Sequence, residues 1–472
     1  MRESSMPPLQ RHRTRKAVAR GSGLPASLQA VHLNAAGIDI GSAEHYVAVP
    51  ADRDPQPVRR FACFTADLER LADWLEQCGI DTVAMESTGV YWIPLFQILE
   101  TRGFEVKLVN ARHVKTVPGR KSDVQDCQWL QQLHTFGLLA GSFRPDDQTC
   151  VLRSYLRQRD TLIRDCAAHI QRMQKALTQM NIHLHQVISD ITGATGMRIL
   201  RAILAGERNP VQLAAMKDPR VRSSRAQIAK ALHGDYRAEH LFALQQSLEL
   251  HDTYRKMIAE CDVHIEHCLA GFDARVDLAE HPLGPPKHGH RTPRGNAVGF
   301  DLRAHLYRIA GVDFTRIDGF DALTVQTILS EVGLDPSRFP SEKHFASWLA
   351  LCPDNRVTGG VVKHTKSRKV VSRVATALRR AAQSAANSRS ALGGFSRRLR
   401  ARLGPAKAIT ATAHKLARIF YRMWKYREPY HPLSLDHYET QYRERTLASL
   451  RKRAAALGFE LVQSPTVSGV VS

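Results

Sequence analysis

Two aspartates, Asp123 and Asp126, combine a residue type and a spacing that could do chemistry. They begin a pattern that predicts a helix, and residues three apart project from the same helix face. Two like charges on one face repel each other, so the arrangement is costly unless a cation lies between them. The pair therefore predicts a cation-binding site at the start of a helix.

Two further acids occur in apolar runs that are typical of buried strands. Asp39 lies within GIDIG at residues 37–41, and Glu86 ends TVAME at residues 82–86. Taken singly, the four acids could be helix caps, turn residues or loop acids, but burying a lone charge such as Asp39 is costly. Together they suit two-metal phosphodiester chemistry, and their oxygen ligands favour Mg²⁺ or Mn²⁺ over zinc. We expect all four to converge on one metal site.

The chain carries a large excess of positive charge. Its 472 residues include 67 Lys and Arg against 45 Asp and Glu, which gives a net charge of +22 and a pI of about 10.0. Such charge favours a polyanionic partner, of which nucleic acid is the commonest. The apolar runs are all shorter than the roughly 20 residues that a membrane helix needs, so no membrane partner is expected.

Between Asp354 and Glu428 the chain has no acidic residue at all. A solvated helix face normally mixes charge signs, so this stretch predicts a phosphate-binding surface. Residues 396–402 and 415–427 predict basic amphipathic helices, the second with four interleaved aromatic residues: Phe420, Tyr421, Trp424 and Tyr426. These helices contribute three candidate nucleic-acid-binding residues: Arg397, Arg398 and Lys415.

The eight cysteines are scattered and form no CxxC pair, which argues against a disulfide framework and favours a reducing cytoplasm. One cluster has spacing that could hold zinc: Cys261, His264, His267 and Cys268. The apolar stripe of the same segment favours a packed helix instead.

The pattern along the chain predicts several domains and an α/β plus α fold class. Residues 31–145 place strands first and then alternate strands with helices, which predicts a mixed sheet. Residues 150–275 hold two runs of near-heptad spacing around a basic insert, which predicts either an antiparallel coiled-coil arm for dimerisation or nucleic-acid binding, or an ordinary helical bundle. A Pro- and Gly-rich linker (276–300) leads to a mainly helical C-terminal domain (301–430). A disordered basic arm (1–30) and a basic helical tail (431–472) complete the expected organisation.

Five motifs together resemble the IS110 (IS110/IS1111) family of transposases. The first three are GIDIG (37–41), MESTGVYW (85–92) and KSDVQD (121–126). The other two resemble the second conserved domain of that family: WLALCPDNR (348–356) and AITATAHKLA (408–417). The resemblance covers nearly the whole chain beyond the basic arm.

The resemblance implies a RuvC-like domain of the RNase H type, whose four metal-binding acids correspond to Asp39, Glu86, Asp123 and Asp126. It also implies a coiled-coil arm and a C-terminal transposase domain, whose nucleophilic serine bonds covalently to DNA in a composite site with the acids of another subunit. The implied cofactor is Mg²⁺, with Mn²⁺ as a substitute. The implied partners are donor and target DNA, a non-coding bridge RNA that guides the reaction, and further copies of the chain in a dimer or tetramer. The implied location is the bacterial cytoplasm, at the nucleoid.

The sequence departs from the family pattern at the nucleophile, because residues 356–360 read RVTGG and place Thr358 where the family has serine. Threonine keeps the hydroxyl but adds a methyl group and stiffens χ1, so both a slower nucleophile and a disabled copy are compatible with it. Ser367 and Ser372 are nearby hydroxyls that could take the role. Four cations follow and are predicted to bind phosphates near the scissile bond: Lys363, Lys366, Arg368 and Lys369.

The leading hypothesis is thus an RNA-guided DNA transposase of an insertion sequence. A site-specific DNA invertase would use the same chemistry, and only the DNA beside the gene separates the two. A RuvC-like nuclease would hydrolyse DNA with the four acids and would not need Thr358. A non-catalytic copy would bind RNA and DNA with strong salt dependence but exchange no strands.

Overall fold

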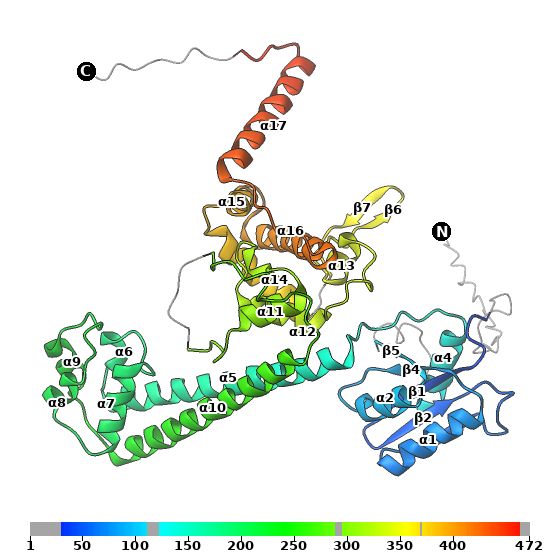
Figure 1. The fold of residues 1–472 in the computed structure, drawn as a ribbon, viewed down its shortest axis with the longest axis horizontal. Helices are drawn as coiled ribbons and strands as arrows, with labels where there is room; N and C mark the ends of the chain where they lie inside the picture. Colours follow the sequence, from blue (N-terminus) through cyan, green and yellow to red (C-terminus); the bar gives the residue numbers. More distant parts are fainter. Residues whose placement is uncertain (1–29, 111–121, 288–294, 369–370, 463–472) are drawn as a thin grey trace, which may run out of the picture. The chain divides into compact units, whose positions relative to one another are not determined.

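The computed structural model describes residues 30–110, 122–287, 295–368 and 371–462 (Figure 1). The chain folds as two compact units, residues 1–144 and 145–472. The predicted basic arm at the N-terminus and Lys369 lie outside the described residues. No helix in the described ranges is long and apolar enough to span a bilayer.

The first unit is built on a five-stranded mixed sheet in the order β3-β2-β1-β4-β5. β1 pairs antiparallel with β2 and parallel with β4, while β2–β3 is antiparallel and β4–β5 parallel. The strands are β1 (Ala35–Ile40), β2 (Glu44–Ala48), β3 (Val58–Ala62), β4 (Thr82–Glu86) and β5 (Glu105–Val109). The predicted mixed sheet is confirmed, and it is compatible with a RuvC-like fold.

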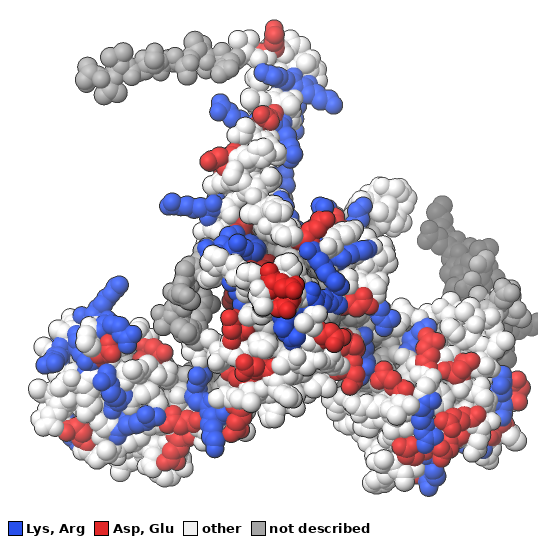
Figure 2. All heavy atoms as spheres, in the orientation of Figure 1, with Lys and Arg blue, Asp and Glu red and all other residues white. Residues whose placement is uncertain are grey.

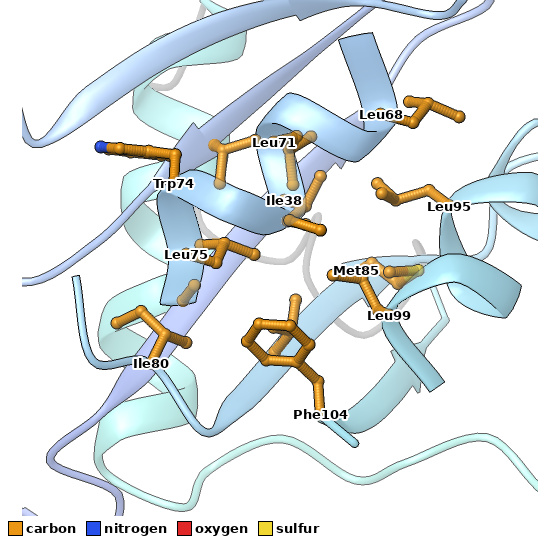
Figure 3. Close-up of a cluster of buried hydrophobic side chains, with 14 of the residues drawn as sticks. Ile38, Leu68, Leu71, Trp74, Leu75, Ile80, Met85, Leu95, Leu99 and Phe104 are labelled. Atoms are coloured by element: carbon orange, nitrogen blue, oxygen red, sulfur yellow. The ribbon is translucent and has the colours of Figure 1, made fainter. Parts of the chain in front are cut away.

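The first hydrophobic core lies between one face of this sheet and two helices, α1 (Thr65–Gln77) and α2 (Trp92–Thr101). Ile38 and Met85 come from the central strands, and Leu71, Leu75 and Leu99 come from the helices (Figure 3). The central strands β1 and β4 are buried on both faces. Their sequences are therefore nearly continuous apolar runs, because both sets of side chains face the protein interior.

The second unit begins with two long helices, α5 (Asp147–Gln179) and α10 (Ala238–Ala270), that pack along each other in opposite directions. Their direction follows from the contacts, since Arg159 bonds to Asp262 whereas Cys166 lies against His251. Four short helices at the far end share one apolar core with both: α6 (Leu184–Val187), α7 (Ala194–Leu204), α8 (Pro210–Ala215) and α9 (Arg225–Ala231). A coiled-coil supercoil of the long pair stays a prediction.

The C-terminal part of the second unit is mainly helical, apart from one hairpin. Its elements are α11 (Leu302–Ala310), a 3-10 turn (Phe314–Arg316), α12 (Ala322–Val332), α13 (Glu342–Trp348), β6 (Arg356–Thr358), β7 (Val361–His364), α14 (Arg373–Ala386), α15 (Ala391–Leu403), α16 (Pro405–Tyr426) and α17 (Leu435–Ala456). The aromatic face of α16 is buried, with Phe420 and Trp424 stacked around Phe345. Of the four interleaved aromatic residues of this helix, Phe420, Tyr421 and Trp424 therefore belong to the core, whereas Tyr426 is exposed.

Candidate active site

The strand register places Asp39 and Glu86 side by side. In the parallel pair β1–β4, Gly37 is opposite Ala84 and Ile38 is opposite Met85, so Asp39 and Glu86 come next on their strands. Side chains alternate between the two faces of a sheet. Both acids therefore project from the face that carries Gly37 and Ala84, opposite to the face packed by α1 and α2.

Helix α4 (Asp123–Thr135) covers this second face and packs mainly on β1. It approaches unusually closely because Gly37 has no side chain. A Cβ at Gly37 would lie 2.2 Å from the Gln131 nitrogen and 2.4 Å from the Cys127 carbonyl oxygen. Both are backbone atoms, so any larger residue would push the helix off the sheet. Glycine at this position therefore sets the distance between α4 and Asp39.

The first turn of α4 carries the other two acids, Asp123 and Asp126. Ser122 begins the helix, and its side chain accepts a hydrogen bond from the Gln125 backbone nitrogen, as an N-cap does. Carboxylates are favoured at a helix N-terminus, where the helix dipole is positive. Asp123 is exposed and Asp126 is half-buried.

Electrostatic coupling joins the four acids. The pKa of Asp39 is raised to about 6, first by burial and then by the charges of Asp123, Glu86 and Asp126, in that order of size. A hydrogen bond from the Ile40 backbone opposes the shift but does not cancel it. The structure thus places Glu86, Asp123 and Asp126 within electrostatic reach of Asp39, and we call these four residues the carboxylate cluster.

The donor set of the carboxylate cluster suits a hard divalent cation, because every candidate ligand is a carboxylate. Within the described ranges, no three His, Cys, Asp or Glu side chains already form a cage that could hold a metal ion. Coulombic coupling reaches well beyond the roughly 2.1 Å of a magnesium–oxygen bond. The four acids therefore interact electrostatically, but their side chains are not arranged closely enough to coordinate one ion.

Thr88 is a residue of this site that the sequence analysis missed. Its hydroxyl donates a hydrogen bond of 2.7 Å to Glu86 Oε1, which fixes the rotamer of a buried carboxylate. The neighbouring Ser87 hydroxyl donates to the Val109 carbonyl and anchors the loop to β5. A hydroxyl two residues after a strand-end acid is the signal that could have indicated this role.

Thr358 lies at the end of β6, directly before the turn of the β6–β7 hairpin. It pairs with Val361, and the two residues between them, Gly359 and Gly360, have φ of +56° and +77°. Positive φ at both central residues defines a type I′ turn, which strongly prefers glycine. A Cβ at either glycine would meet nothing within 4 Å, so the turn is open, and Thr358 itself is exposed.

The cations after the hairpin are accessible. Lys363, Lys366 and Arg368 are exposed, and Arg368 also donates a hydrogen bond to the Ser347 carbonyl. Ser372, one of the two alternative hydroxyls, caps α14 by accepting from the Ala375 nitrogen at 3.1 Å. That cap gives Ser372 a structural task, which makes it a poorer candidate for nucleophile than Thr358.

The other three candidate nucleic-acid-binding residues have contacts within the protein. Arg397 Nη1 donates to the Ala386 and Ser388 carbonyls, at 3.0 and 2.8 Å. Lys415 Nζ lies 4.3 Å from the centre of the Phe395 ring, and its pKa is lowered, mainly by burial. Arg398 is stacked against tyrosine rings of α17. These contacts give all three a role in packing.

The possible zinc ligands all lie on α10. Cys261 and Cys268 are half-buried, and the His264 ring stacks on Tyr155 of α5 with a centroid distance of 5.2 Å. These contacts favour the packed-helix interpretation. All eight cysteines of the chain are free thiols.

Two family models match successive parts of the chain. The DEDD transposase model of IS110 elements covers residues 36–182, which include the carboxylate cluster. The model of the transposase IS116/IS110/IS902 family covers residues 313–396, which include Thr358. A comparison with curated proteins finds no match. The chain therefore belongs to the IS110 family of transposases, and it is a DNA transposase of an insertion sequence.

Proposed function

We propose that this transposase is an RNA-guided DNA recombinase that cuts and rejoins donor and target DNA. The carboxylate cluster would bind Mg²⁺, or Mn²⁺ in its place, and the Thr358 hydroxyl would attack the DNA. The observation that carries the proposal is the coupling of Asp39 to three other acids at one sheet edge, where its pKa is raised to about 6. Divalent cations are the ligands that best relieve such repulsion among carboxylates.

The chemistry is an exchange of phosphate esters. When bound, Mg²⁺ supplies charge that polarises the scissile phosphate and stabilises the leaving oxygen. Thr358 Oγ1 forms a bond to phosphorus while the bond to the leaving DNA oxygen breaks. The hydroxyl proton passes to a phosphate oxygen, and the leaving oxygen takes a proton from water. A hydroxyl of a second DNA strand then displaces Thr358, so each step replaces one ester by another.

The position of Thr358 supports this role. It lies beside an open turn on an exposed hairpin, which a DNA backbone can approach closely. The exposed cations Lys363 and Lys366 would neutralise the flanking phosphates. Thr358 belongs to the second unit and the carboxylate cluster to the first. We propose that a homodimer or tetramer joins them into a composite site, with the hydroxyl from one subunit and the acids from another.

The guide in this proposal is a bridge RNA that pairs with both DNA molecules, in the cytoplasm of a bacterial cell at its nucleoid. The net charge of +22 supports binding of more than one nucleic-acid strand. The family resemblance, rather than any contact in the structure, is the basis for the RNA.

A recombination assay tests the catalytic proposal directly. Full-length protein is incubated with Mg²⁺, RNA transcribed from the flanks of the gene, and matched donor and target DNA, and the products are separated on a denaturing gel. We expect covalent protein–DNA adducts in wild type, more adduct with Thr358→Ser because the hindering methyl group is gone, and none with Thr358→Ala. Asp123→Ala should abolish all products.

Two results would change the conclusion. Cleavage that survives Thr358→Ala but not Asp123→Ala would replace the covalent mechanism by that of a hydrolytic RuvC-like nuclease, which the carboxylate cluster favours because all its members lie in one unit. Products from Thr358→Ser alone would identify the natural chain as a disabled copy that still binds nucleic acid. An invertase would give adducts too, and the DNA beside the gene distinguishes it.

A further inference from the structure

Helix α17 is a feature that the proposed chemistry does not use. It follows the segment matched by the second family model, which ends at residue 396. None of its 22 residues is buried. Helices in proteins gain most of their stability from packing of an apolar face. A helix of this length with so little packing is therefore expected to have a ligand.

The first half of α17 is held on α15 by a specific clamp. The Arg398 guanidinium lies 4.9 Å from the centre of the Tyr438 ring and 3.9 Å from that of Tyr442, and it pairs with Glu439 at 3.5 Å. Gly394 lets the helices approach, since a Cβ there would lie 3.0 Å from Leu435 Cδ1. Cation–π contacts of this kind are attractive, because the face of an aromatic ring carries negative partial charge. The clamp thus orients α17 relative to the C-terminal domain.

The second half of α17 presents cations in several directions. Residues 443–456 include five cations and one acid, Glu444. All five cations are exposed: Arg443, Arg445, Arg451, Lys452 and Arg453. Figure 2 shows Lys and Arg side chains projecting from this helix. Successive helical residues are about 100° apart, so the last three cations span roughly 200° of the helix circumference.

Two exposed leucines lie between these cations. Leu447 and Leu450 are 38% and 44% exposed and, three residues apart, share one helix face. At 100° per residue, Arg451 and Arg453 lie on the two sides of this face and Lys452 lies nearly opposite to it. Arg451 and Arg453 thus fit a ligand with phosphate on both flanks of the helix and less polar surface between. That arrangement describes a nucleic-acid groove better than a flat surface.

We infer that α17 binds in the major groove of duplex DNA, with Arg398 as the residue that positions it. The major groove of B-form DNA, about 12 Å wide, admits an α-helix. The major groove of an RNA duplex is too deep and narrow for side chains to read, which favours DNA over RNA. Leu447 and Leu450 would contact thymine methyl groups, and the cations would contact the phosphates. This DNA contact is independent of which hydroxyl performs the chemistry.

The first test measures the salt dependence of binding to duplex DNA. The variant Arg451→Gln/Lys452→Gln/Arg453→Gln is compared with wild type as full-length protein. Each phosphate contact contributes about 0.9 to the slope of log affinity against log salt, so the loss of the contacts of Arg451 and Arg453 should make the slope shallower by about 2. The matched control, Arg222→Gln/Arg225→Gln/Lys230→Gln, removes three exposed cations near α9 and should leave the slope unchanged. An unchanged slope in the α17 variant, or equal changes in both variants, overturns the inference.

The second test locates the contact and identifies the ligand. A photo-crosslinking benzoylphenylalanine at position 450 should form adducts with duplex DNA, and Tyr442→Leu in the same protein should reduce them several-fold. Tyr442→Phe keeps the ring over Arg398 and should preserve the adducts. Circular dichroism checks that both variants stay helical. Adducts with RNA or protein alone, or equal yields with Leu and Phe, overturn the inference.

Discussion

The Asp39 carboxylate lies half-buried beside three other acids, and its pKa is raised from 3.8 to about 6. The folded chain therefore holds a proton on Asp39 at pH values where the unfolded chain has released it. Between about pH 4 and pH 6 the native state binds more protons, so the free energy of unfolding falls as the pH rises through this range. Above about pH 6 Asp39 is charged in both the folded and the unfolded chain, so its contribution to the free energy of unfolding no longer changes with pH.

Asp39→Asn is consequently expected to raise the Tm of metal-free protein at pH 8 by a few degrees, since it removes this charge and keeps the side-chain volume. At pH 4, where Asp39 is protonated in wild type, the difference should nearly disappear. Thermal unfolding in EDTA at both pH values measures the effect. Added Mg²⁺ should then stabilise wild type at pH 8 but not Asp39→Asn. Lower stability of Asp39→Asn at pH 8 would contradict the assigned electrostatics.

At the residue scale, the sequence indicated the four acids clearly but gave little indication of the residues that hold their side chains in place. Asp39 and Glu86 stand out because an acid is unexpected in an apolar strand, and Asp123 and Asp126 because of their spacing. Thr88 carries only a weak signal, a hydroxyl two residues after a strand-end acid, because hydroxyl side chains are ordinary in loops. Its role depends on the direction that the chain takes after β4, which no local pattern encodes.

At the element scale, the close contact of α4 with β1 determines where half of the carboxylate cluster lies. The helix axis can come near the sheet only because Gly37 leaves space for the Cys127 and Gln131 backbone. Neither neighbour is a flexible side-chain end that could move aside. Displacement of α4 would carry Asp123 and Asp126 away from Asp39 together.

Gly37→Ala is therefore expected to weaken metal binding and to reduce recombination by about 10²-fold, the typical cost of a misplacement near 1 Å. Mn²⁺ titration by calorimetry measures the metal affinity independently of activity, and circular dichroism reports on folding. Gly299→Ala is a suitable control, because a Cβ there meets nothing within 4 Å. Wild-type Mn²⁺ affinity in Gly37→Ala would show that the position of α4 does not depend on this glycine.

Elements were predictable where their signals are local. Strands β1 and β4 follow from apolar runs, and the start of α4 follows from a capping serine before two acids. The burial of the aromatic face of α16 could not be predicted from the helix alone, for a physical reason. Helical periodicity shows that one face differs from the other, but it does not show whether that face meets the core or a ligand. The buried Phe345 that decides the matter is distant in the sequence.

At the scale of the whole molecule, one buried ion pair ties together three distant segments. Arg159 of α5 pairs with Asp262 of α10, and the two are only 4% and 8% exposed. Arg159 Nη2 also donates to the Asn296 carbonyl at 3.1 Å, in the segment that leads to the C-terminal domain. Heptad spacing alone could not indicate this pairing, which joins residues 103 positions apart.

Asp262→Leu should destabilise the second unit by about 3–5 kcal/mol, because it leaves the Arg159 charge buried without its partner. The double variant Arg159→Met/Asp262→Leu removes both charges and should recover most of that loss. Urea unfolding of the two variants and wild type measures the difference. If the double variant is as unstable as the single one, the pair acts mainly through its geometry rather than its charge.

The order of the two units along the chain has a consequence for truncated translation products. A ribosome completes the four acids by residue 126 and reaches Thr358 only after the whole arm has been made. Under the proposed mechanism, a truncated product that ends in the arm lacks the hydroxyl needed for covalent joining. Such fragments, which arise from nonsense mutations or aborted translation, could not exchange strands unaided. Under the proposed mechanism, the order of the units thus confines complete recombination to chains that extend at least through Thr358.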